Sequence, residues 1–160
     1  MTLYGHKSSV ATVVFNSNGK VALTASDDAT AKTWSITKTL WRTAKGICLR
    51  TFTGHGDVLN AATFSSDGTL VLTSSNDMTA KMWNSTSGVC MRTFTGHTHW
   101  VNTAIFSFDS ASVITASFDH TCKLWSPATG ECTLTLAGHT DAIMSVCQAP
   151  VKAARGSNPF

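Results

Sequence analysis

Residues 54–94 read GHGDVLNAATFSSDGTLVLTSSNDMTAKMWNSTSGVCMRTF, and a similar stretch, GHTHWVNTAIFSFDSASVITASFDHTCKLWSPATGECTLTL, follows at residues 96–136. A Gly-His pair opens each stretch, and the same pair stands at Gly5-His6 and Gly138-His139. The last three pairs are 42 residues apart, whereas 49 residues separate the first two. The seven additional residues fall in the segment Ile36–Lys45, which we interpret as a loop insertion. A fixed period of this length predicts an array of equivalent structural units.

Each unit contains four short segments with the composition of β-strands, separated by turn residues. The first strands are expected at Val10–Phe15, Leu59–Phe64 and Val101–Phe106, and the second at Val21–Ser26, Leu70–Ser75 and Ser112–Ser117. The third strands run to Trp34, Trp83 and Trp125, and the fourth comprise Cys48–Phe52, Cys90–Phe94 and Cys132–Leu136. Helical crossovers do not fit between segments spaced this closely, so each unit is predicted to be a four-stranded antiparallel meander.

With Gly-His near one end of each unit and Trp near the other, the chain resembles the WD-repeat β-propeller family. One departure is consistent, since Ser35, Asn84 and Ser126 stand where the family has Asp. The resemblance implies an all-β fold, a partial β-propeller of three complete four-stranded antiparallel blades plus fragments of neighbouring blades. The propeller segment is expected to span residues 1–147, with repeats at about 5–52, 54–94 and 96–136 and a partial repeat at 138–147. Residues 148–160 leave the pattern and are expected to form a flexible C-terminal tail.

The resemblance also implies a hydrogen-bond relay inside each blade, formed by the His of Gly-His, a Thr, an Asp and the Trp. Each Asp lies four residues after its Thr and six before its Trp. The three sets are His6, Thr24, Asp28 and Trp34; His55, Thr73, Asp77 and Trp83; and His97, Thr115, Asp119 and Trp125. In such a relay every buried polar atom finds a partner. A catalytic constellation would occur once, beside a pocket, so its recurrence in every blade favours a structural role.

Proteins of this family bind partners through the loops at one face of the ring, around its central channel. The resemblance implies contacts three and five residues after each His and at the residue before the turn Asp. These positions are Ser9, Ala11 and Asp27; Val58, Asn60 and Asn76; Trp100, Asn102 and Phe118; and Ala142 and Met144. Trp100 and Phe118 are large apolar groups at exposed positions and are the candidate hot spot. The alternative is that Trp100 packs on a neighbouring loop or on the insertion that contains Trp41.

Composition restricts the class of protein. Charged residues make up 13% of the chain and hydrophobic residues 42%, which is typical of a folded protein and not of a disordered one. The net charge of +3 is spread along the chain, without the basic stripe of a nucleic-acid-binding surface. With neither an apolar run of about 20 residues nor a signal peptide, the chain is expected to be intracellular, cytoplasmic or nuclear, with no membrane partner.

The five cysteines are odd in number and contain no C-x-x-C pair, so a disulfide framework is not expected. Cys48, Cys90 and Cys132 recur at the repeat period and are interpreted as small core fillers. The pair His97-x-His99 has no third ligand beside it, so no metal site is predicted. Catalytic and cofactor-binding motifs are also absent from the sequence, so we expect neither an enzyme nor a cofactor.

These features together favour a protein-interaction scaffold. Two alternatives are a propeller that binds nucleic acid and a non-catalytic propeller fragment of a larger multidomain protein. Because about four to eight blades are needed to close a propeller, three blades leave the ring open. We expect further repeats of a longer chain to complete a seven-bladed ring, with self-association or pairing with another repeat protein as the alternatives.

Overall fold

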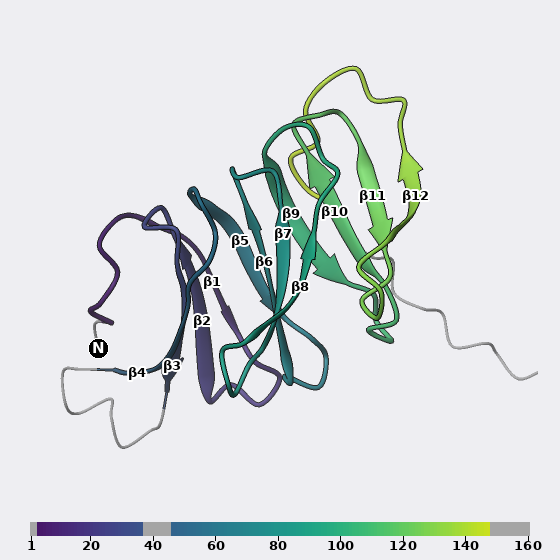
Figure 1. Cartoon of the computed structure of the whole chain (residues 1–160). Helices are drawn as coiled ribbons and strands as arrows, with labels where there is room; N and C mark the ends of the chain where they lie inside the picture. The colour runs from purple at the N-terminus through teal and green to yellow at the C-terminus, as the bar shows by residue number, and fades with distance from the viewer. Residues whose placement is uncertain (1–2, 37–45, 148–160) are drawn as a thin grey trace, which may run out of the picture.

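The computed structural model describes residues 3–36 and 46–147, and all the regular structure in them is β-strand (Figure 1). Twelve strands form three separate four-stranded antiparallel sheets, each built from strands that are consecutive in the chain. In these residues no helix has the length and apolar character needed to cross a membrane. The expected all-β fold with three four-stranded blades is therefore confirmed.

We number the sheets blade 1 to blade 3 in chain order. Blade 1 comprises β1 (Val10–Phe15), β2 (Val21–Ser26), β3 (Ala31–Ser35) and β4 (Ile47–Phe52). Blade 2 comprises β5 (Leu59–Phe64), β6 (Leu70–Ser75), β7 (Ala80–Asn84) and β8 (Cys90–Phe94). Blade 3 comprises β9 (Val101–Phe106), β10 (Val113–Ser117), β11 (Cys122–Trp125) and β12 (Cys132–Leu136).

The strands lie within a residue or so of their expected positions. β10 begins at Val113 and not at Ser112, because β11 ends at Trp125, the partner of Val113, and pairs no residue with Ser112. The expected partial repeat at 138–147 contains no strand, although the Ile143 N–H donates to the carbonyl of Ser117 at 3.0 Å. Residues 37–45 and 148–160, which hold most of the insertion and the whole expected tail, lie outside the described residues.

The hydrophobic core lies between neighbouring blades. One cluster joins Leu23 and Phe52 of blade 1 to Val71 and Trp83 of blade 2, and a second joins blades 2 and 3 in the same way. The ring of Phe52 lies edge-on to Trp83, with centroids 5.8 Å apart. Because each sheet buries one face against the next, the blades stack side by side in the order of the chain (Figure 1).

The outward faces of the two end blades stay open. Val13 and Phe15 of β1 are 56% and 60% exposed, and Leu134 and Leu136 of β12 are each 49% exposed. In blade 2, the equivalent of Phe15 is Phe64, which packs into the core against blade 1. The described residues thus form an arc that ends on two apolar sheet faces.

Candidate functional site

In blade 2 a hydrogen-bond relay links the loop before β5, strand β6, the turn after it and strand β7. His55 Nδ1 lies 2.7 Å from Asp77 Oδ2, and its Nε2 lies 2.8 Å from the hydroxyl of Thr73. The indole N–H of Trp83 donates to the same hydroxyl at 2.9 Å. Since that hydroxyl accepts from the indole, its own proton can be donated to Nε2, which leaves Nδ1 protonated toward the carboxylate.

The same geometry recurs in the other two blades. The His Nδ1 to Asp Oδ2 distance is 2.9 Å in blade 1 and 2.6 Å in blade 3. The His Nε2 to Thr Oγ1 distance is 2.7 Å in both, and the indole N–H donates at 2.8 Å in both. The structure therefore brings together the four side chains of each expected set: His6, Thr24, Asp28 and Trp34; His55, Thr73, Asp77 and Trp83; and His97, Thr115, Asp119 and Trp125.

The glycine before each histidine allows the chain to pass close over the indole ring. Gly54 has a φ of +142°, and a Cβ built there would lie 3.4 Å from Cη2 of Trp83. A side chain at that φ is strained, so glycine is the residue that fits. The result is that His55 rests beside Trp83, with ring centroids 6.1 Å apart.

Sequence reasoning missed two further members of each relay. Thr79 donates its hydroxyl to Asp77 Oδ1 at 2.7 Å, and Ser75 accepts the Asp77 N–H at 3.1 Å while donating to the carbonyl of Asp57. The equivalents in the other blades make the same contacts: Thr30, Thr121, Ser26 and Ser117. Their recurrence two residues after and two residues before each turn Asp was the signal that would have found them.

The turn aspartates are held in their ionised form. Burial alone would raise the pKa of Asp119, but hydrogen bonds from Thr121, His97 and the Thr98 N–H together lower it to about 2. The same balance of burial against hydrogen bonds holds the pKa of Asp28 and of Asp77 far below the usual range. Burial lowers the pKa of His97, with the Asp119 carboxylate opposing it. Each relay therefore pairs a carboxylate with an imidazole, and in blade 3 burial favours the neutral ring.

The buried hydroxyl at the centre of each relay is poorly placed for nucleophilic catalysis. Thr73 and Thr115 are each 0% exposed, and each is capped by an indole N–H. A nucleophile needs access to a substrate and a geometry poised toward it. What this arrangement can do is tie the loop before the first strand to the second and third strands.

A second candidate site is a cluster of three aromatic side chains at one end of blade 3. Trp100 and Phe118 meet edge to face with ring centroids 5.3 Å apart, and His99 stacks on Phe118 at 5.5 Å. Trp100 is 43% exposed and Phe118 is partly buried. The backbone N–H of Phe118 donates to the carbonyl of Trp100, so the two positions are tied together. Trp100 thus packs on its own blade, and the rival contact with Trp41 lies outside the described residues.

Other expected contact residues bridge neighbouring blades. The amide of Asn60 donates to the carbonyl of Val101 in blade 3 at 2.9 Å, and also to Asn76 Oδ1 at 2.8 Å. The amide of Asn102 donates to the carbonyl of Ile143 at 3.0 Å, one repeat further on, and lies 3.4 Å from the sulfur of Met144. Met144 is 66% exposed, and Val58 is partly buried. Asn60 and Asn102 therefore use their side-chain amides for hydrogen bonds within the chain.

The expectation that the recurrent cysteines fill the core is wrong. They lie on β4, β8 and β12, the outermost strands of their sheets, and are exposed: Cys48, Cys90 and Cys132. In β4 and β8 only the last residue is buried, Phe52 and Phe94, and in β12 every residue is exposed. Each thiol lies near a carbonyl and a threonine hydroxyl of its own strand, which a small polarisable group can do at a sheet edge.

In residues 3–36 and 46–147 no group of three or more His, Cys, Asp or Glu side chains is close enough to hold a metal ion. Of the closely spaced pair, His97 belongs to the relay and His99 stacks on Phe118.

Comparison with known families supplies one match. The model of WD40, described as the WD domain, G-beta repeat, matches residues 1–35, 46–84 and 88–126. The second match begins at the last strand of blade 1, and the third at the last strand of blade 2. Each of those two matches therefore spans the last strand of one blade and the first three strands of the next. A sequence repeat and a blade are thus offset by one strand, and each such repeat links two neighbouring blades. No curated protein sequence matches the chain.

Proposed function

The chain belongs to the WD40 family of G-beta repeats, whose members are typically non-catalytic scaffolds for protein–protein interaction, and we propose that it is such a scaffold. Its partners are other proteins, bound on the face formed by the loops before each first strand and the turns after each second strand. We call this surface the loop face. Loops held by a rigid sheet scaffold are the usual carriers of recognition.

The observation that carries this proposal is the aromatic cluster of His99, Trp100 and Phe118. It lies on the loop face of blade 3, and its largest member leaves 43% of its surface in water. Trp and other aromatic side chains dominate the energy of protein interfaces because they bury a large area with little loss of conformational freedom. Mutual packing fixes the three rings in advance, which lowers the entropic cost of binding.

The hydrogen-bond relays favour a structural role for the side chains that form them. Their polar groups satisfy one another, and their hydroxyls are closed to substrate, which favours a protein without enzymatic activity. Further G-beta repeats, packed on the open faces at Phe15 and Leu136, complete the ring in this proposal. The exposed free thiols at Cys48, Cys90 and Cys132 support a reducing compartment, the cytoplasm or the nucleus.

The test compares partner capture by the wild-type chain with capture by Trp100→Ala and Phe118→Ala. We expect each substitution to weaken the main partner by at least about tenfold, as interface hot spots do. The matched control is Phe108→Ala, since Phe108 is 73% exposed in the β9–β10 turn at the opposite end of the same blade. Quantitative affinity purification followed by a binding isotherm supplies the measurement.

The proposal fails if all three variants retain the same partners at the same affinity. It also fails if Phe108→Ala removes them while the loop-face variants do not, because the binding surface would then lie at the opposite end of the sheets.

A further inference from the structure

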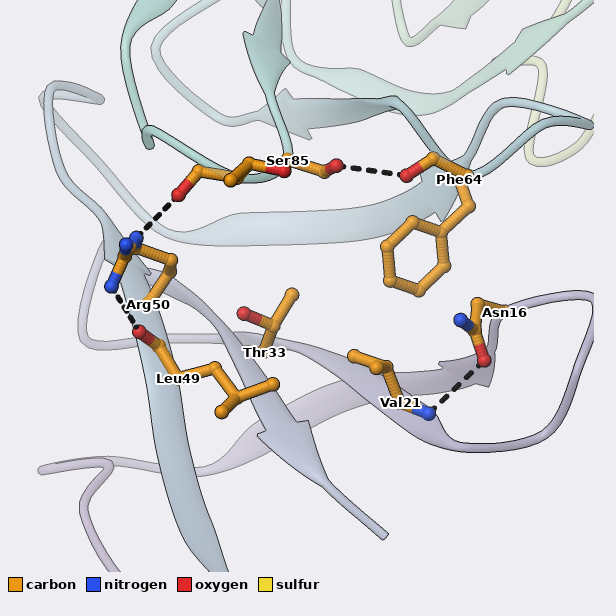
Figure 2. A pocket seen from close by; sticks show the side chains of 9 residues that line it. Asn16, Val21, Thr33, Leu49, Arg50, Phe64 and Ser85 are labelled. Atoms are coloured by element: carbon orange, nitrogen blue, oxygen red, sulfur yellow. Dashed lines mark hydrogen bonds between the residues drawn. The ribbon is translucent and has the colours of Figure 1, made fainter.

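A cavity of about 290 Å³ opens between blades 1 and 2 (Figure 2). It lies away from the relays and from the aromatic cluster, and its lining includes Val21 and Thr33 of blade 1 and Phe64 of blade 2. The volume approaches the lower end of the range of small-molecule sites, about 300 Å³.

The cavity exists because two side chains that line it, those of Val21 and Thr33, are small. One repeat later, Leu70 stands at the position of Val21, and Met82 stands at the position of Thr33. Met82 is 4% exposed and packs in the core between blades 2 and 3, with Leu70 against it. The shorter side chains of blade 1 leave the corresponding space between blades 1 and 2 unfilled.

Two polar groups in this lining have hydrogen-bonding capacity left over. Thr33 is 3% exposed, yet its hydroxyl has no hydrogen-bond partner among the described residues. Figure 2 shows Thr33 in the middle of the lining, between Arg50 on one side and Asn16 and Val21 on the other. Thr33 lines the cavity, so its hydroxyl can form a hydrogen bond with a group that enters the cavity.

Arg50 supplies the charge. Its Nε donates to the carbonyl of Thr86 in blade 2 and its Nη1 to the carbonyl of Leu49, while its Nη2 has no partner among the described residues. In the next blade Arg92 uses all three nitrogens, with Nη2 bound to the carbonyl of Ala128 at 2.6 Å. Among the described residues Arg50 also forms no ion pair.

No other charged side chain is part of the described lining. Asp67 precedes the lining residue Gly68, but its carboxylate is engaged in its own turn by Ser65 and Thr69. The cavity therefore combines an apolar wall, an aromatic ring and one uncompensated guanidinium, which is suited to a carboxylate.

We propose that the cavity between blades 1 and 2 binds a small aromatic carboxylate. The ligand's ring lies against Phe64 and Val21, and its carboxylate accepts from Arg50 Nη2 and from the Thr33 hydroxyl. This site is separate from the loop face, so a small molecule and a protein partner can be held at once.

The probe is 3-phenylpropionate, with the neutral amide 3-phenylpropionamide as its isosteric control. Amide chemical shifts of the ¹⁵N-labelled full chain are followed by NMR during titration. We expect saturable shifts at Thr33, Phe64 and neighbouring residues, with a dissociation constant on the order of 1 mM, as suits a ligand of this size. The carboxylate is expected to bind about tenfold more tightly than the amide.

Two variants test the assignment. The double substitution Val21→Leu and Thr33→Met gives this cavity the residues that fill the next one, and it should weaken 3-phenylpropionate at least about tenfold while preserving the fold. Arg50→Gln should remove the preference for carboxylate over amide, and it decides the question if the double variant does not fold.

The proposal is overturned if wild-type and double variant bind equally, if the carboxylate preference survives in Arg50→Gln, or if no saturable shift occurs. Shifts confined to the open faces at Phe15 and Leu136 would also overturn it.

Discussion

Replacing Thr73 with valine removes the hydroxyl at the centre of the blade 2 relay while keeping the shape of the side chain. That hydroxyl lies 2.8 Å from His55 Nε2 and accepts from the Trp83 indole at 2.9 Å. Two hydrogen bonds at about 1 kcal/mol each are lost, and a buried indole N–H and a ring nitrogen are left without partners at a further cost. We expect a loss of about 2–4 kcal/mol in the free energy of unfolding.

The matched control is Thr12→Val. The Thr12 hydroxyl is also buried, but it has no hydrogen-bond partner among the described residues. Both substitutions exchange a hydroxyl for a methyl group, so the difference between them isolates the hydrogen bonds of the relay. Since Thr12→Val removes an unsatisfied polar group, it should be neutral or stabilise by up to about 1 kcal/mol.

Urea unfolding followed by tryptophan fluorescence measures both changes through the transition midpoint at constant slope. The slope also reports whether the blades still unfold together. A difference below about 0.5 kcal/mol between the two variants would refute the role given to the relay.

Three other expectations follow from the same structure. Asp77→Ala should destabilise the chain by about 2–4 kcal/mol, because His55, Gly56 and Thr79 lose a shared acceptor; an unchanged urea midpoint would contradict this. On acidification, stability should fall below pH 6.5, because the lowered pKa of His97 lets the unfolded chain take up the proton first. Stability should fall a second time between pH 3.8 and about 2, because in this range Asp119 is protonated in the unfolded chain and not in the folded one. A urea midpoint that does not change from pH 7 to pH 2 would exclude both of these losses of stability. Under native alkylation with iodoacetamide, Cys122 should react most slowly, since burial and the nearby Asp119 raise its pKa. The cysteines expected to react faster are the exposed ones: Cys48, Cys90, Cys132 and Cys147. Equal alkylation rates for all five cysteines, measured by mass spectrometry, would contradict this difference in exposure.

The repeat period and the strand pattern determined most of the fold from the sequence alone. Turn residues and apolar alternation are local signals, and their repetition in three units removes the ambiguity that a single unit would carry. The relay sets were implied by the resemblance to the WD-repeat family, and the constant spacing from Thr to Asp to Trp identified their members in each repeat. The threonine and serine that extend each relay carried a periodic signal too, which was overlooked.

Other features were decided by tertiary structure, because they depend on which faces neighbouring blades cover. Periodicity marked Cys90 as equivalent to Cys48, but only the stacking of the sheets shows that both lie on an outer edge. The amide of Asn60 is turned to the next blade, a contact between residues 41 apart that no local pattern encodes. The cavity beside Thr33 likewise arises from a difference in side-chain volume between two successive junctions, and volume acts only once the sheets are packed.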